Sequence, residues 1–127
     1  MKIPILKLKD ILLTSIQVDL TDEDALAFQS DILVMVSKHE ALGVLIDITA
    51  LEVVDSFMAR VLNETATMAK LLGAQVVISG MQPSVSVTLI EMGRELVGVE
   101  TALNLEQGLA MLERNISSST PSNMNSI

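Results

Sequence analysis

A serine stands beside an aspartate at the point where the pattern of the sequence changes. Asp55 and Ser56 follow an apolar run at 43–49, and the residues at 56–72 then recur at helical spacing. The first N–H groups of a helix lack partners within the helix, and a serine in this place usually serves as the N-cap. The same N–H groups and the positive end of the helix dipole also accommodate a phosphate. Ser56 is therefore predicted to cap a helix, and the same position suits a phosphoacceptor.

Phosphorylation would change the charge around Ser56 strongly. A phosphoserine carries about −1.5 to −2 charge at neutral pH. The helix end favours that charge, whereas the neighbouring Asp55 opposes it. The added charge would repel a partner that binds the unmodified site. Two roles stay open for Asp55: it shapes recognition by a kinase, or it helps to repel the partner after modification.

Asp47 and His39 suggest two other kinds of chemistry. Asp47 lies near the end of the strand-like segment "LIDIT", as the phosphorylated aspartate of two-component receiver domains does. Such a domain also needs an acidic pair after its first strand and a lysine after a later one, and "LLTSIQV" and "VVISGMQ" contain neither. His39, the single histidine, stands at the end of a predicted helix, where a cation or polar group is favourable.

The motifs of common enzyme classes are absent from the sequence. It contains no G-x-S-x-G elbow, no dinucleotide fingerprint and no P-loop. It contains no cysteine, which excludes disulfides, thiolate catalysis and cysteine-based zinc sites. We therefore expect no catalytic residue, no metal site and no cofactor, which is the pattern of a protein that is not an enzyme.

The composition indicates one acidic, soluble domain. The 127 residues suit a single domain, and the 50% that are hydrophobic suffice for a core of aliphatic side chains. Eight basic and sixteen acidic residues leave a net charge of −8, which repels nucleic acid and anionic membrane but suits a protein with a basic face. No apolar run approaches the roughly 18 residues of a membrane-spanning helix, and the amino-terminus does not resemble a signal peptide. We expect a cytoplasmic protein.

Two short strands and a long amphipathic helix are predicted in the first third of the chain. Segments 3–8 and 11–17 are rich in Ile and Leu and are separated by a turn. Thr21 and Asp24 form a capping box at the start of the helix, which ends near Gly43. The apolar face of this helix consists of Ala25, Phe28, Ile32 and Val36.

The rest of the chain alternates between buried strands and helices. Nearly continuous apolar runs such as 43–49 and 74–80 are typical of strands buried on both faces. Short connections on either side of the intervening helix predict a strand–helix–strand unit. The other expected elements are a helix at 56–72 ended by Gly73, a helix opened by Pro83 and ending near Gly93, a short strand within 96–101, and a helix at 104–115 capped by Asn104, with Leu105, Leu109 and Leu112 facing inward.

This order of elements predicts an α/β domain. Four or five strands form a mixed sheet, and helices pack against it. We expect the domain to occupy residues 1–115. Residues 116–127 are rich in Ser and Asn and contain few residues that form a core, so we expect a disordered tail there.

Three segments carry a resemblance to a known family. They are "KIPILKL" with "LLTSIQ" near the start, "DSFMARVL" at 55–62, and "SGMQPSVSVTLIEMG" at 79–93. In these segments and in the order of its elements, the chain resembles the STAS domain of bacterial anti-sigma-factor antagonists, and most of all the RsbS-type proteins of the stressosome. The resemblance covers roughly residues 1–114. It implies a single STAS domain with a mixed four- to five-stranded sheet.

The resemblance also implies roles for individual residues. Asp55–Ser56 matches the family's Asp-Ser or Asp-Thr pair, so Ser56 would be phosphorylated by a serine-protein kinase of the GHKL type. Sporulation-type antagonists follow this pair with Ser-Gly, whereas Phe57 and Met58 follow it here. This difference favours the stressosome branch. Asp55, Phe57, Met58 and Arg60 are expected to recognise partners near the switch.

The function implied by the resemblance is a switch in the bacterial stress response. The protein would assemble with R-type STAS paralogues that carry an N-terminal sensor domain, as a homodimer within a large hetero-assembly. It would sequester a T-type kinase until Ser56 is phosphorylated, and an X-type phosphatase would reset the site. The alternatives are a sporulation-type antagonist, a receiver-like small regulatory domain, and a structural assembly protein whose serine only caps a helix.

Overall fold

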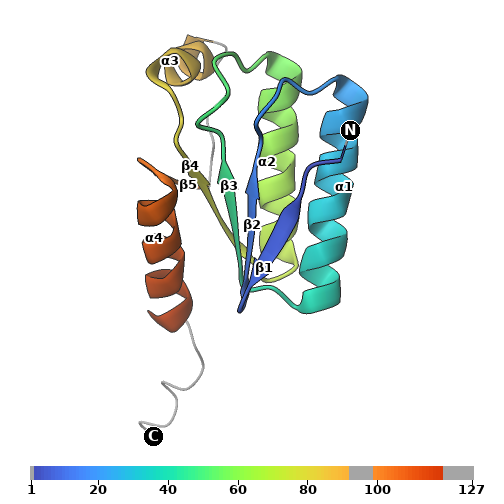
Figure 1. The fold of residues 1–127 in the computed structure, drawn as a ribbon, viewed down its shortest axis with the longest axis vertical. Coiled ribbons are helices and arrows are strands. Elements are labelled where there is room, and N and C mark those ends of the chain that lie inside the picture. Colours follow the sequence, from blue (N-terminus) through green and yellow to red (C-terminus); the bar gives the residue numbers. More distant parts are fainter. Residues whose placement is uncertain (1, 92–98, 119–127) are drawn as a thin grey trace, which may run out of the picture.

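A five-stranded sheet with helices on both faces forms the centre of the molecule, seen here in a computed structural model (Figure 1). The structure describes residues 2–91 and 99–118. The elements are β1 (Ile5–Leu8), β2 (Ile11–Ser15), α1 (Asp22–His39), β3 (Gly43–Asp47), α2 (Ser56–Leu71), β4 (Gln75–Ser79), α3 (Pro83–Glu91), β5 (Glu100–Ala102) and α4 (Leu105–Ser118).

The strands lie side by side in the order in which they occur in the chain. β1 pairs with β2 in antiparallel fashion, and β2, β3, β4 and β5 are parallel. The predicted mixed α/β sheet is confirmed. The receiver-like alternative is wrong, because doubly wound folds of that type have the strand order 2-1-3-4-5.

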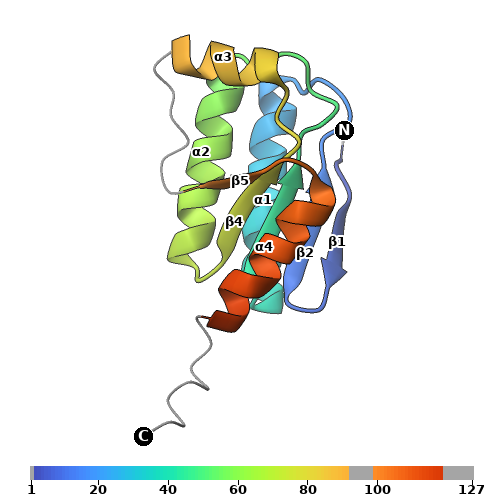
Figure 2. The same ribbon diagram turned by 90° about the vertical axis from the view of Figure 1, so that its left-hand side faces the viewer.

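Alternate residues of the strands face two different layers. One face packs against α1 and α2, and the other packs against α4 (Figure 2). Leu12, Ile46 and Ile78 lie fully buried in the larger core, which α1 and α2 share. A smaller cluster between α4 and the sheet consists of Ile11, Leu45 and Val77 from the strands and Leu112 from α4. The central strands are therefore buried on both faces, as their continuous apolar runs predict.

The capping signals in the sequence are confirmed at two helices. The Asp24 N–H donates to Thr21 Oγ1 at 3.1 Å, and the Thr21 N–H donates to Asp24 Oδ2 at 3.4 Å, which completes the capping box of α1. At α4, the Gln107 N–H donates to Asn104 Oδ1 at 2.8 Å. The four apolar residues expected on the inner face of α1 are all buried.

α4 differs from the prediction in its inner face and in its end. The predicted inner positions Leu112 and Leu109 are confirmed, since Leu112 is buried and Leu109 is half-buried against the smaller cluster. Leu105 was wrongly placed there, because it is 39% exposed, and Gly108 is buried instead. A Cβ at Gly108 would lie 2.7 Å from Leu45 Cδ1, so the helix approaches the sheet too closely for a side chain there. The helix also continues to Ser118, into the segment expected to be a tail, because Ile116 packs against the smaller cluster.

The remaining boundaries shift by a few residues. β5 is confirmed only for Glu100–Ala102, and the part of its predicted range at 96–98 lies outside the described residues. Gly93, expected near the end of α3, also lies outside them. Gly73 follows α2 with φ 98°, the left-handed conformation that glycine adopts at helix ends.

A substitution in α4 tests whether its packing stabilises the domain. Leu112→Ala should lower the free energy of unfolding by about 3 kcal/mol, because it leaves a cavity over the sheet. Leu105→Ala, on the same helix but largely exposed, should lower it by less than about 1 kcal/mol. Urea denaturation followed by circular dichroism measures both. Equal losses would mean that α4 is not anchored through Leu112.

Candidate functional site

The candidate site lies between the end of β3 and the start of α2. A loop at 48–55 leads from the carboxyl end of β3 to the first turn of α2. The amino-terminus of α1 lies at the same edge of the sheet, and α3 lies across this edge (Figure 1). The fold therefore brings two helix amino-termini and one loop together around Ser56.

Asp55, and not Ser56, is the N-cap of α2. Its backbone is extended, with φ −80° and ψ 176°, and its Oδ1 accepts a hydrogen bond of 2.8 Å from the Met58 N–H. The prediction that Ser56 caps the helix is wrong. Aspartate caps about as well as serine, and its negative charge also suits the positive end of the helix. Asp55 thus has a structural role that the sequence left open.

Ser56 is the first residue of α2 and is exposed. In the described part of the chain, its hydroxyl makes no hydrogen bond that would hold it in place. Ser56 is one of the first residues of the helix, whose N–H groups have no intrahelical partner. The hydroxyl of Ser56 is therefore open to solvent at the positive end of a helix.

The residues that follow Ser56 point in different directions. Phe57 is half-buried, and Met58 is half-buried and packs against the larger core. Arg60 lies one turn further along, with its guanidinium 5.2 Å from the centre of the Phe57 ring. It also approaches Glu64 at 3.8 Å, an exposed pair that contributes little to stability. Phe57 and Arg60 thus form a contact on the surface of α2 beside Ser56.

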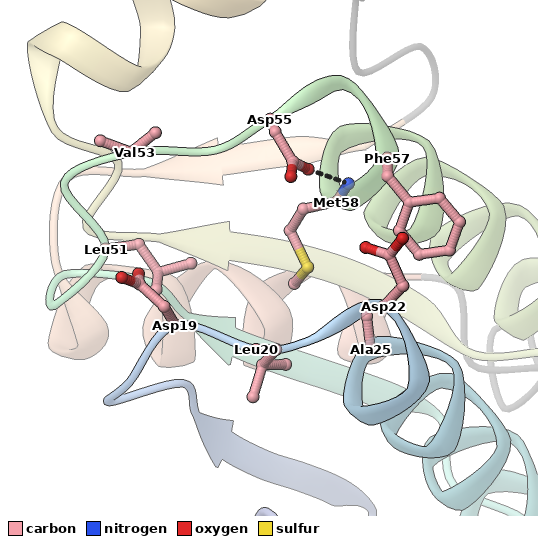
Figure 3. Close-up of a pocket in the computed structure, with 9 residues that line it drawn as sticks. All are labelled: Asp19, Leu20, Asp22, Ala25, Leu51, Val53, Asp55, Phe57 and Met58. Atoms are coloured by element: carbon pink, nitrogen blue, oxygen red, sulfur yellow. Dashed lines mark hydrogen bonds between the residues drawn. The ribbon is translucent and has the colours of Figure 1, made fainter.

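A pocket of about 250 Å³ lies between the loop before α1 and the loop before α2. Figure 3 shows the side chain of Met58 reaching into it from above, with Leu20 on the opposite side. No lysine or arginine lines the pocket, and its rim is acidic. Three carboxylates and six apolar side chains line it: Asp19, Asp22, Asp55, Leu20, Ala25, Leu51, Val53, Phe57 and Met58.

Asp47 lies at the same edge of the sheet, but it is part of a cluster of hydroxyl groups. Its carboxylate is buried and accepts hydrogen bonds from Ser15, Thr49 and Ser79. This cluster was not predicted from the sequence. Polar residues at the ends of three neighbouring parallel strands are the signal that could have revealed it, since those ends meet at one edge. His39 lies in the last turn of α1, as expected.

Within residues 2–91 and 99–118, no group of three His, Cys, Asp or Glu side chains is placed to hold a metal ion. In the same part of the chain, no helix combines the length and the apolar character needed to cross a membrane.

Comparison with known proteins assigns the family. The profile of the STAS domain matches residues 2–107. The chain belongs to the STAS domain family. A solved variant of RsbS from Moorella thermoacetica is 41% identical to this STAS domain, with a TM-score of 0.82 over 92% of this chain and 99% of that one. A chain in a structure of the stressosome, described as a signal integration and transduction hub, is 44% identical, with a TM-score of 0.78 over 88% and 97% of the two chains.

A curated relative of this STAS domain is a longer protein. The RsbT co-antagonist RsbRA of Bacillus subtilis is 33% identical over 98 residues, which are 74% of this chain and 36% of that protein. The chain thus spans about a third of the length of this relative. The resemblance to stressosome proteins of the RsbS type is confirmed. A protein of Thermotoga maritima, 14% identical with a TM-score of 0.74 over 88% and 95% of the chains, shares the fold.

Substitution of Asp55 tests its capping role. Asp55→Ala should lower the free energy of unfolding by about 1 kcal/mol, because the Met58 N–H loses its acceptor. Asp55→Asn retains an acceptor and should restore most of the loss. Ser56→Ala should change the free energy by no more than about 0.5 kcal/mol. If thermal or urea unfolding showed a greater loss for Ser56→Ala than for Asp55→Ala, the assignment of the cap would be wrong.

Proposed function

We propose that this STAS domain is a phosphorylation-controlled interaction module of a stressosome, and not an enzyme. It holds a T-type serine-protein kinase until that kinase phosphorylates Ser56. The observation that carries the proposal is the position of Ser56. It is exposed, it is the first residue of α2, and Asp55 performs the capping in its place.

The geometry of α2 explains how a phosphate would act there. The positive end of the helix tolerates the added charge, so modification need not unfold α2. The phosphate would instead change the charge of the surface, where Asp19, Asp22 and Asp55 already make the adjacent pocket acidic. A phosphate would add about −1.5 to −2 charge beside these three carboxylates. A partner that binds the unmodified surface would then meet a changed charge on an unchanged fold.

Phe57, Met58 and Arg60 supply the rest of the proposed docking surface. Phe57 and Met58 line the pocket, and Arg60 lies over the Phe57 ring. This surface combines apolar side chains with both signs of charge, which suits recognition of a protein better than binding of a small metabolite. Asp55 contributes to it through its cap and its charge.

The relatives support the proposed partners. RsbRA is named a co-antagonist of RsbT, and a chain in the stressosome structure shares 44% of its residues with this one. We propose that R-type paralogues with sensor domains, further copies of this chain and the T-type kinase form one large assembly in the cytoplasm. An X-type phosphatase would reset Ser56. The STAS domain, in which α4 continues to Ser118, would then supply the contacts.

A phosphomimetic variant tests the proposal. Ser56→Asp should weaken binding of the T-type kinase at least tenfold, as measured by isothermal titration calorimetry, while the thermal midpoint stays within a few degrees of wild type. Aspartate in the first turn of a helix is favourable, so the effect would not come from unfolding.

Gln107→Glu provides the matched control. It adds the same single charge, also in the first turn of a helix, but on the face of the sheet that α4 covers. It should leave kinase binding unchanged. If both variants bind like wild type, the chain is a structural assembly protein. If both variants weaken kinase binding equally, the weakening comes from the net charge of the protein and not from the position of the charge at Ser56.

A further inference from the structure

A buried carboxylate lies at the start of the loop that carries Asp55 and Ser56. Asp47 is the last residue of β3 and is 7% exposed. In the sheet it is paired with Ser15 on one side and Ser79 on the other. Their hydroxyls donate to it at 3.3 Å and 2.9 Å. Neutral donors alone satisfy this carboxylate among the contacts that the structure describes, which is an expensive arrangement in a protein interior.

The third donor to Asp47 comes from the loop itself. Thr49 Oγ1 donates to Asp47 Oδ1 at 2.9 Å, and the Thr49 carbonyl accepts a hydrogen bond of 2.8 Å from Gln82 Nε2. Thr49 is therefore held from both sides, by the end of β3 and by the segment before α3. We call this pair of hydrogen bonds the Asp47–Thr49–Gln82 clasp.

The segment that follows β4 is shaped to receive Thr49. Gly80 has φ 76°, and a Cβ on it would lie 1.9 Å from Thr49 Oγ1. A side chain at this position would therefore collide with the clasp. A few residues further, the Ser84 hydroxyl donates to the Glu52 carbonyl at 3.3 Å. The loop thus contacts this segment at two points.

Leu51 and Val54 also hold the loop, but in a different way. Both are buried in the larger core. Apolar burial is non-directional, so it keeps the loop on the core without fixing where its first residues lie. Hydrogen bonds are directional, so the clasp, together with the hydrogen bond of 2.9 Å from the Ile48 N–H to the Ser79 carbonyl, fixes the path by which the loop leaves β3.

We propose that Asp47 is a positioning residue for Ser56. Through Thr49 and Gln82, it fixes the loop and so the orientation in which the first turn of α2 presents Ser56 to a kinase. This inference rests on the proposed function for its consequence, phosphorylation of Ser56, but the clasp itself can be tested without a kinase.

Two donors to the same oxygen give a matched pair of variants. Thr49→Val removes the donor that belongs to the loop, and Ser79→Ala removes one that belongs to the buried strand β4, at the same 2.9 Å distance. Hydrogen–deuterium exchange should show the amides of Leu51 and Met58, which donate to the Ile48 carbonyl and to Asp55 Oδ1, exchanging about tenfold faster in Thr49→Val, the change expected for one hydrogen bond to a charged group. Ser79→Ala should leave these amides within twofold of wild type. Thr49→Ser, which keeps the hydroxyl, should restore slow exchange.

Phosphorylation by the T-type kinase and ATP provides the second readout. Thr49→Val and Gln82→Leu should each slow phosphorylation of Ser56 about fivefold, and the double variant should be no slower than either single one, because both break the same clasp. Ser79→Ala should react at the wild-type rate. A structural role for the whole cluster would instead affect Ser79→Ala as much as Thr49→Val.

Each failure has its own meaning. Equal exchange in Thr49→Val and Ser79→Ala would overturn the clasp. Faster exchange without slower phosphorylation would overturn the positioning role of Asp47. A wild-type protein that the kinase does not phosphorylate would contradict the proposed function, and the exchange comparison would still decide whether the clasp holds the loop.

Discussion

The hydrogen bond between the Asp55 carboxylate and the Met58 N–H determines what Ser56 can do. A helix amino-terminus needs an acceptor for its unpaired N–H groups, and a serine that supplies it is engaged with the backbone. Here Asp55 supplies it at 2.8 Å. Ser56 moves one position into the helix, where its hydroxyl faces solvent. The cap and the proposed phosphoacceptor are thus two adjacent residues, so phosphorylation of Ser56 would leave the hydrogen bond that caps the helix in place.

The sheet topology determines what surrounds this pair. Parallel strands send their connecting loops to the same edge, so the loops before α1 and α2 meet there. The acidic pocket and the hydroxyl cluster around Asp47 both follow from this arrangement, although the residues are far apart in the chain. The pocket lies on the outside, where a partner can reach it, and Asp47 lies beneath, where it fixes the loop.

The sequence predicted most of the fold because the signals were local. The capping box at Thr21, the glycine after α2 and the continuous apolar runs each depend on neighbouring residues. In α4, Leu112 and Leu109 were predicted correctly, but Gly108 was missed because its burial depends on how closely the helix approaches Leu45, a distance set by the sheet. The cap of α2 was assigned to the wrong residue because Asp and Ser cap helices almost equally well. Residue type alone could therefore not decide between Asp55 and Ser56. The contacts of Asp47 join three segments and needed the structure.

Mapping the phosphate on the wild-type protein tests the central claim most directly. The protein would be incubated with the T-type kinase and ATP, digested, and analysed by tandem mass spectrometry. We predict a single phosphate, on Ser56. A phosphate on another residue such as Ser84, or none at all, would contradict it.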